Sequence, residues 1–215
     1  MKLTFGPSID GPLRLVVREL GTYELPAAHG EEAFYVLDGA AHVDGTVVPP
    51  GGAVVLHADE PCTIEGLARV AHFASAERGA IGGRHLIGPG GWYQSGSPGG
   101  SQATWFTDST CDGCGVALFR VERDTPNNRG RSHSHSADEI LFVVHGAITL
   151  GAHQVAAGEA VFIPADTRYA ITCGPTKHAF LNYRARASTQ LYDDDATPLP
   201  ENGVGRGGVL VGDFL

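Results

Sequence analysis

The sequence contains no apolar run that approaches the length of a membrane span, and its first residues lack the apolar core of a signal peptide. Basic residues are also few, because 15 Lys and Arg stand against 24 Asp and Glu and give a formal net charge of −9. This balance argues against a surface for nucleic acid or for an anionic membrane. We therefore expect a cytoplasmic protein whose partner is a small-molecule substrate.

Cysteine is rare, with 4 residues in 215. Cys111 and Cys114 form a C-x-x-C pair, but the sequence has no second pair and no strand and helix pattern of the thioredoxin kind around it. A zinc ribbon or a redox pair is therefore not favoured. Cys62 and Cys173 stand alone, and we expect all four thiols to be reduced.

Stretches that keep a helical period are also scarce, so we expect few helices. Instead, 30 glycines and 13 prolines separate short apolar runs, namely Leu13–Val17, Ala53–Leu56, Val116–Val121 and Ala160–Ile163. Regular short strands with turn residues between them predict an all-β protein, either a sandwich or a barrel. The chain is long enough to bury a core without disulfides, in one large domain or two small ones.

Candidate metal ligands stand close together in the second half of the chain. His133 and His135 would point the same way from an extended strand, and Glu139 can fold back beside them across the turn at Ser136–Asp138. Two imidazoles and one carboxylate suit Fe(II), Mn(II), Ni(II), Co(II) or Zn(II) and leave coordination positions open for substrate or dioxygen. The pattern therefore predicts one divalent transition metal at these three residues.

This segment resembles the first motif of the cupin superfamily, which is a glycine, H-x-H, three or four residues, E, six residues and G. His133, His135, Glu139 and Gly146 match that motif. The resemblance implies a jelly-roll β-barrel. The chain also repeats itself, so we expect two such barrels in tandem. A shift of 107 residues aligns three pairs without a gap: Glu32 with Glu139, Gly39 with Gly146 and Gly51 with Gly158.

The second cupin motif, which supplies a fourth ligand in the family, is only partly kept. After Gly158 and Pro164, Asp166 stands where the motif has glycine, which is a mild change because Asp tolerates the left-handed turn. Tyr169 stands where the motif has histidine. A neutral phenol with a pKa near ~10 ligates poorly, so we expect Tyr169 to hydrogen-bond a metal-bound group instead.

Two other histidines could restore a fourth nitrogen ligand. His178 begins the strand-like run His178–Arg186, and His145 has the parity of Glu139. We take Tyr169 and His178 as the candidate catalytic residues. Single arginines on strands, Arg120 and Arg184, are candidates to clamp a substrate carboxylate or phosphate.

The first copy is predicted to be degenerate. Pro26, Ala28 and Cys62 stand where the second copy has His133, His135 and Tyr169. Of the ligand set only Glu32 survives, with His29 and His57 as an irregular alternative. We expect this copy to hold no transition metal and to serve as a wall of the active barrel or as the face of a homodimer.

The predicted divisions of the chain are a degenerate barrel at 1–80, a Gly-rich linker at 81–110, a metal-binding barrel at 111–190 and an irregular tail at 191–215. The resemblance implies a wide range of activities. A His, His and carboxylate set also matches the non-haem Fe(II) oxygenases, so we favour Fe(II) and a dioxygenase. A Lewis-acid metal isomerase, epimerase or lyase is the first alternative, and a non-catalytic binding protein is the second.

Overall fold

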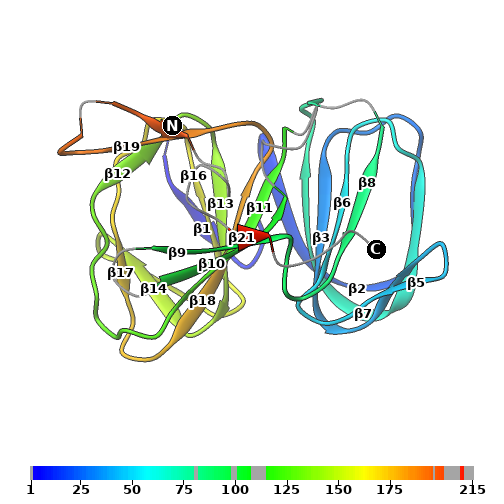
Figure 1. The fold of residues 1–215 in the computed structure, drawn as a ribbon, viewed down its shortest axis with the longest axis horizontal. Helices are drawn as coiled ribbons and strands as arrows, with labels where there is room; N and C mark the ends of the chain where they lie inside the picture. Colours follow the sequence, from blue (N-terminus) through cyan, green and yellow to red (C-terminus); the bar gives the residue numbers. More distant parts are fainter. Residues whose placement is uncertain are drawn as a thin grey trace.

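The computed structural model describes residues 2–79, 82–97, 101–107, 115–195, 197–200 and 209–210. Within these residues the secondary structure is entirely β, which confirms the predicted fold class. The strands form two lobes side by side, which we call the first and the second barrel (Figure 1). None of the described residues forms a helix that would be able to span a bilayer.

The first barrel is one seven-stranded sheet. Its longest strand, β7, pairs along its length with β2, β3 and β4, so the sheet curves around this strand. The bounds are β2 (Leu13–Leu25), β3 (Glu32–Gly39), β4 (Ala41–Val43), β5 (Thr46–Val48), β6 (Ala53–Leu56), β7 (Cys62–Ser75) and β8 (Arg84–Ile87).

The second barrel combines an eight-stranded sheet with two three-stranded sheets. The large sheet has the order β1 (Thr4–Gly6), β16 (Ala160–Ile163), β13 (Glu139–His145), β18 (His178–Arg184), β11 (Ala117–Arg123), β10 (Ser101–Thr107), β9 (Tyr93–Ser97) and β21 (Val209–Leu210). One small sheet has the order β12 (His133–His135), β19 (Thr189–Tyr192) and β20 (Leu199–Pro200). The other has the order β15 (His153–Ala156), β14 (Ala147–Leu150) and β17 (Ile171–Cys173).

The predicted divisions of the chain differ from these sheets at three places. The range 81–110 contains β8, which completes the first barrel, and β9 and β10, which belong to the second. The predicted tail contains the end of β19 and the strands β20 and β21. The strand β1, from the first copy, pairs with β16 of the second barrel. Cys111 and Cys114 lie outside the described residues.

The sequence repeat is visible in the strand register. In the first barrel Glu32 pairs with Leu56, and in the second Glu139 pairs with Ile163, which are the same positions 107 residues apart. Alternate residues of these strands face opposite ways, because side chains along a strand alternate. One face of each strand packs inside its own barrel and the other packs between the barrels.

The core therefore has three parts. Phe34 and Val36 belong to the cluster inside the first barrel, and Leu141 to the one inside the second. A third cluster joins the two barrels, where the rings of Phe73 and Tyr183 stack with their centroids 5.0 Å apart. This shared core holds the two barrels against each other and leaves the interior of each barrel as a separate space.

Candidate active site

The motif residues converge at one end of the second barrel. His133 and His135 form β12, Glu139 opens β13, and Tyr169 lies in an isolated bridge to His133 with backbone hydrogen bonds of 2.9 and 3.0 Å. Asp166 has a φ of 59°, so it takes the left-handed turn expected at the position where the motif has glycine. The turn therefore brings Tyr169 to the place predicted from the spacing.

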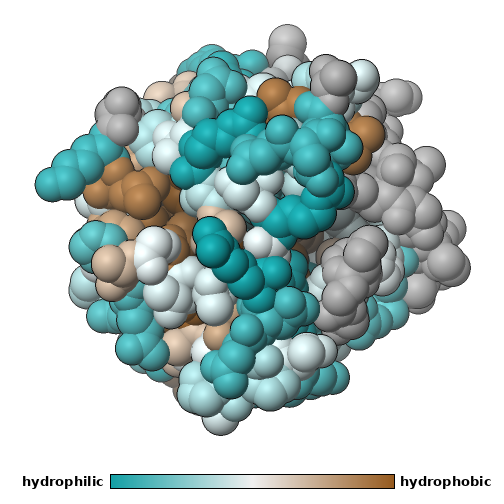
Figure 2. All heavy atoms as spheres, turned by 90° about the vertical axis from the view of Figure 1, so that its left-hand side faces the viewer, coloured by the Kyte–Doolittle hydropathy of each residue, from teal (hydrophilic) through white to brown (hydrophobic). Residues whose placement is uncertain are grey.

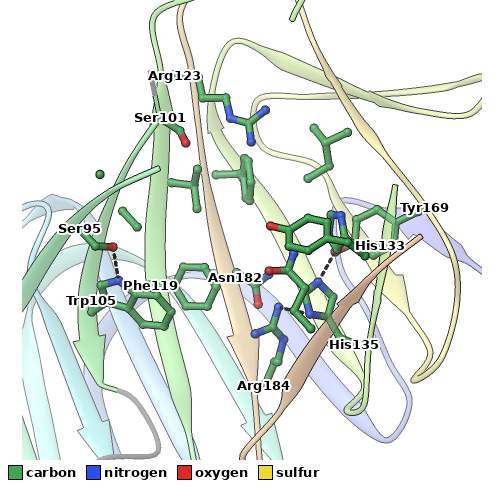
Figure 3. A pocket seen from close by; sticks show the side chains of 17 residues that line it. Ser95, Ser101, Trp105, Phe119, Arg123, His133, His135, Tyr169, Asn182 and Arg184 are labelled. Carbon is green, nitrogen blue, oxygen red and sulfur yellow. Dashed lines mark hydrogen bonds between the residues drawn. The ribbon is translucent and has the colours of Figure 1, made fainter. Parts of the chain in front are cut away.

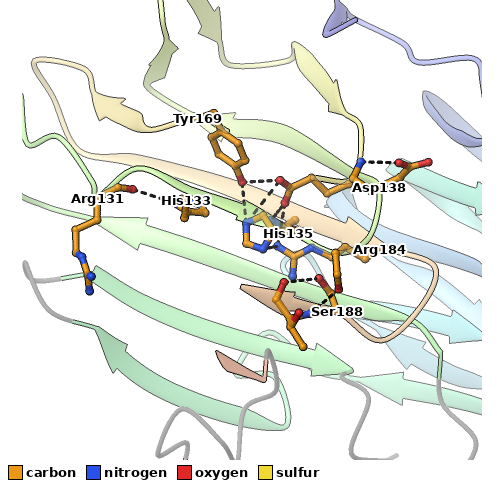
Figure 4. Close-up of polar contacts among 12 residues, drawn as sticks. Arg131, His133, His135, Asp138, Tyr169, Arg184 and Ser188 are labelled. Carbon is orange, nitrogen blue, oxygen red and sulfur yellow. Dashed lines mark hydrogen bonds and ion pairs between the residues drawn. The ribbon is translucent and has the colours of Figure 1, made fainter. Parts of the chain in front are cut away.

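Buried polar groups surround the carboxylate of Glu139, and Figure 4 shows three of them, Tyr169, His135 and Arg184, close together. The hydroxyl of Tyr169 donates to Oε1 at 2.5 Å, and the side chains of Asn182 and Arg184 donate to Oε2 at 2.8 and 2.9 Å. Glu139 and Arg184 are each only 1% exposed. The guanidinium therefore neutralises the carboxylate inside the barrel, because a buried charge without a partner would be costly.

His135 completes this network. Its Nε2 lies 3.0 Å from the hydroxyl oxygen of Tyr169, and its Nδ1 lies 3.3 Å from Nη2 of Arg184. Since Arg184 can only donate and Tyr169 already donates to Glu139, the pattern assigns the imidazole proton to Nε2. A continuous chain of hydrogen bonds thus runs from Arg184 through His135 and Tyr169 to Glu139.

His133 lies beside this network. Its Nδ1 is 2.8 Å from the carbonyl oxygen of Arg131, and its ring centroid is 4.8 Å from that of His135. Within the described part of the chain, no group of three His, Cys, Asp or Glu side chains is arranged to hold a metal ion. Nε2 of His135 lies 3.7 Å from Oε1 of Glu139, so two of the three predicted ligands are close together. A metal ion held by His133, His135 and Glu139 stays a prediction.

A cavity of about 240 Å³ opens beside the network (Figure 3). His133, His135, Tyr169, Asn182 and Arg184 line its polar side, whereas Glu139 lies behind them. The apolar part of the lining comes from β10, β11, β17 and β18 and includes Trp105, Phe119, Val121, Ile171 and Phe180. Strands β9 and β19 also contribute to the wall, with polar residues such as Ser95 and Gln190. A small organic molecule would therefore meet Tyr169 and His135 directly.

Other candidate residues lie away from this polar group. His178 is fully buried but does not line the cavity, and neither ring nitrogen has a hydrogen-bond partner. Burial lowers its pKa, and the positive charge of Arg123 lowers it further. His145 is exposed at the end of β13. Arg120 donates to the hydroxyl of Tyr35 in the first barrel, at 2.9 Å, and does not line the cavity.

Two residues of the site were not among the candidates chosen from the sequence: Asn182, which no motif indicates, and Arg123, one of several arginines near the motif. Asn182 lies two residues before Arg184 on β18, so strand alternation from Arg184 would have placed it on the same face. Arg123 ends β11 and lines the cavity. Its signal was weaker, because nothing in the local sequence shows which end of a strand reaches a cavity.

The first barrel keeps a carboxylate at the equivalent place. Glu32 accepts a hydrogen bond from Nε2 of His72 at 2.5 Å, and not from His29 or His57. His57 instead contacts Glu31, with its Nδ1 3.0 Å from Oε2, and its Nε2 is 3.0 Å from Nε2 of His85. The partner of Glu32 was therefore not among the residues considered from the sequence.

Comparison with known proteins gives a likeness in structure alone, since no family model and no curated protein matches the sequence. An oxalate decarboxylase of Lactobacillus farciminis, in a formate complex, has a TM-score of 0.67 at 14% identity over 84% of this chain and 79% of that one. A point mutant of salicylate 1,2-dioxygenase from Pseudoaminobacter salicylatoxidans, in complex with gentisate, has a TM-score of 0.58 at 10% identity over 88% and 74%.

A globulin has a TM-score between those of these two proteins. Procruciferin, an 11S globulin of Brassica napus, has a TM-score of 0.62 at 7% identity over 84% of this chain and 78% of that one. At such identities the likeness shows the fold and does not identify an activity. The chain therefore has the jelly-roll fold of the cupin proteins.

Proposed function

We propose that this chain is an enzyme of the cupin fold that acts on a small organic anion in the cavity of the second barrel, by moving a proton through Tyr169. One observation carries the proposal. The hydroxyl of Tyr169 lines the cavity and lies 2.5 Å from Oε1 of Glu139 and 3.0 Å from Nε2 of His135. Within such a short chain of donors and acceptors, a proton that enters at the cavity can be passed on.

The direction of the hydrogen bonds assigns a role to each group. Tyr169 can accept a proton from a substrate carbon while it passes its own proton to Glu139, and the reverse steps return a proton to the substrate. His135 donates to the phenol oxygen and so stabilises negative charge that develops there. Arg184 holds Glu139 and His135 in place from behind. This chemistry is that of an isomerase, epimerase or lyase.

Arg123 supports an anionic substrate. It lies apart from His135 and Arg184 in the cavity (Figure 3), and its Nε is buried without a hydrogen-bond partner. No described carboxylate forms an ion pair with it, and its hydrogen bond to a described side chain is a weak one, from Nη1 to the Sγ of Cys173 at 3.8 Å. A guanidinium in this situation favours a bidentate carboxylate or phosphate.

Proton exchange into candidate substrates tests this proposal. Small hydroxy and keto acids in D2O would be followed by NMR for loss of the proton next to the carboxylate. We expect exchange with the wild-type protein and a loss on the order of 10²-fold or more in Tyr169→Phe. Tyr93→Phe, which changes a tyrosine outside the cavity lining, is the control. Equal exchange in Tyr169→Phe and wild type would remove Tyr169 from the mechanism.

A non-haem iron dioxygenase is the second candidate, and the salicylate 1,2-dioxygenase among the similar structures supports it. It would require His133, His135 and Glu139 to converge on one Fe(II), or on Mn, Ni, Co or Zn in a related enzyme. Anaerobic titration with Fe(II), followed by dioxygen uptake, tests this candidate. Stoichiometric iron that is lost in His135→Ala would favour it over proton transfer without a metal.

A further inference from the structure

The first barrel has a pocket of its own at the end that corresponds to the active-site end of the second barrel. The pocket has a volume of about 400 Å³ and lies over β2 and β7. Its lining is Ser8, Ile9, Asp10, Arg14, Val16, Arg18, Tyr23, His72 and Ala74. The predicted loss of metal ligands from this barrel does not account for a pocket.

Strand register relates the two sites residue by residue. In the second barrel Leu141 pairs with Asn182, and in the first Phe34, its equivalent, pairs with His72. His72 thus stands where Asn182 stands, and each binds the equivalent glutamate. The residue two positions further along the strand is Arg184 in the second barrel, but Ala74 in the first.

Ala74 explains why the pocket exists. The side chain of Arg184 fills the space beside Glu139, whereas Ala74 has only a methyl group beside Glu32, with which it pairs across the strands. On its other side Ala74 pairs with Arg14 of β2. In the first barrel the positive charge therefore comes from Arg14 on the neighbouring strand β2. The space between Arg14 and the hydrogen-bonded pair of Glu32 and His72 is left open.

The charges of the pocket favour an anion. Arg14 and Arg18 lie on the same face of β2, and no described carboxylate forms an ion pair with either of them. The guanidinium of Arg18 lies over the ring of Tyr23, 4.2 Å from its centroid, which orients it. Asp10 is the one described carboxylate of the lining, because Glu32 lies behind His72 and is bound by its imidazole. At the rim two guanidinium groups therefore stand against one acid.

The floor of the pocket is a rigid polar group among aromatic rings. His72 stacks on Phe34 with ring centroids 4.1 Å apart and meets the edge of Tyr23 at 5.2 Å. Its Nε2 is held by Glu32. A ligand here would find two cations at the rim and an imidazole with an aromatic edge below.

We propose that the first barrel binds a small organic molecule through an oxyanion group, a carboxylate or a phosphate, which Arg14 and Arg18 hold above His72. This site is separate from the cavity of the second barrel and does not depend on the reaction proposed there. The protein then has two small-molecule sites, one in each barrel, with different sources of positive charge.

Site-resolved titration tests the proposal. Full-length protein labelled at histidine with ¹⁵N and ¹³C would be titrated with benzoate and, separately, with inorganic phosphate, while the ring signals of His72 and His135 are followed. We expect saturable shifts at His72 with at least one probe. Preference for benzoate indicates a carboxylate ligand and preference for phosphate a phosphate ligand, and either supports the site.

Variants separate this site from general anion binding. Arg14→Gln with Arg18→Gln should weaken the binding seen at His72 at least tenfold. Arg69→Gln, an exposed arginine of β7 outside the lining, should leave it unchanged. Ala74→Arg should fill the pocket and abolish binding. Unmoved His72 signals with both probes, or undiminished binding in the double arginine variant, would overturn the proposal.

Discussion

The two barrels place a glutamate at the same position and surround it differently. Glu139 receives hydrogen bonds from a phenol, an amide and a guanidinium, whereas Glu32 receives one from the imidazole of His72. Both carboxylates are buried, at 1% and 7% exposure. The repeat has thus kept the acid in both barrels and changed the groups that compensate its charge.

This difference determines what each barrel interior can do. In the second barrel a permanent cation is buried against the acid, so the charges of Glu139 and Arg184 cancel there and the lining offers Tyr169 and His135 to a ligand. In the first barrel the cations are Arg14 and Arg18, which lie on β2 at the rim of the pocket. Figure 2 shows the end of the molecule formed by the second barrel, where hydrophilic residues cover much of the surface and apolar residues form separate patches.

The largest expected effect tests the buried ion pair of the second barrel. Arg184→Met leaves Glu139 buried without its cation and should lower the free energy of unfolding by about 3–5 kcal/mol. Urea unfolding measures it. Arg131→Met removes an exposed arginine paired with Asp194 and Asp195 and should leave the unfolding midpoint almost unchanged. Equal midpoints in the two variants would mean that Arg184 is not needed to compensate Glu139.

The next prediction compares the two glutamates directly. Glu139→Gln leaves the guanidinium of Arg184 without a carboxylate and should cost about 3 kcal/mol. Glu32→Gln affects only an imidazole that can be neutral, so it should cost about 1 kcal/mol. Both are measured by urea unfolding. If Glu32→Gln costs as much as Glu139→Gln, the two barrels do not differ in charge compensation as described.

Equivalent glycines test whether the backbone of the two barrels is under the same constraint. Gly39 and Gly146 have φ values of +73° and +70°, and a Cβ at either would lie 2.0 or 2.5 Å from a backbone carbonyl oxygen. Alanine at either position should cost about 2–3 kcal/mol. Gly45 and Gly151 also have positive φ but open space, so alanine there should cost only about 1 kcal/mol. A much smaller cost at Gly39 than at Gly146 would mean that the two equivalent positions are not under the same constraint.

Much of the fold follows from local patterns that the sequence shows plainly. The positions of His135, Glu139 and Tyr169 could be predicted because a tight turn and strand alternation fix their spacing. The range 81–110 could not, because its glycines suggested a linker while its strands pair at long range, as Ser101 does with Arg123. Pairing between distant segments leaves no local signal.

The contacts of the site, like the pairing of distant strands, could be predicted only where a local pattern indicates them. The motif predicted which residues come together, but not that Arg184 would reach Glu139, since strand parity places Arg184 and His178 on one face without saying which lies at the open end.

The last comparison concerns acid sensitivity in the first barrel. Burial, with a smaller contribution from the charge of nearby His57, lowers the pKa of His85 to about 4. The folded protein therefore resists protonation of His85, while the unfolded chain takes up the proton near its ordinary pKa of 6.5. The stability from neutral His85 is full above pH 6.5 and is lost as the pH falls toward 4.

His85→Phe should accordingly flatten the decline of stability between pH 6.5 and pH 4. Unfolding midpoints in urea at several pH values measure this slope for the wild type and the variant. His153→Phe, an exposed histidine of the second barrel, should keep the wild-type slope. A slope that His85→Phe does not change would place the acid sensitivity elsewhere. His178 is the next residue to replace, because its pKa is lowered in the same direction inside the second barrel.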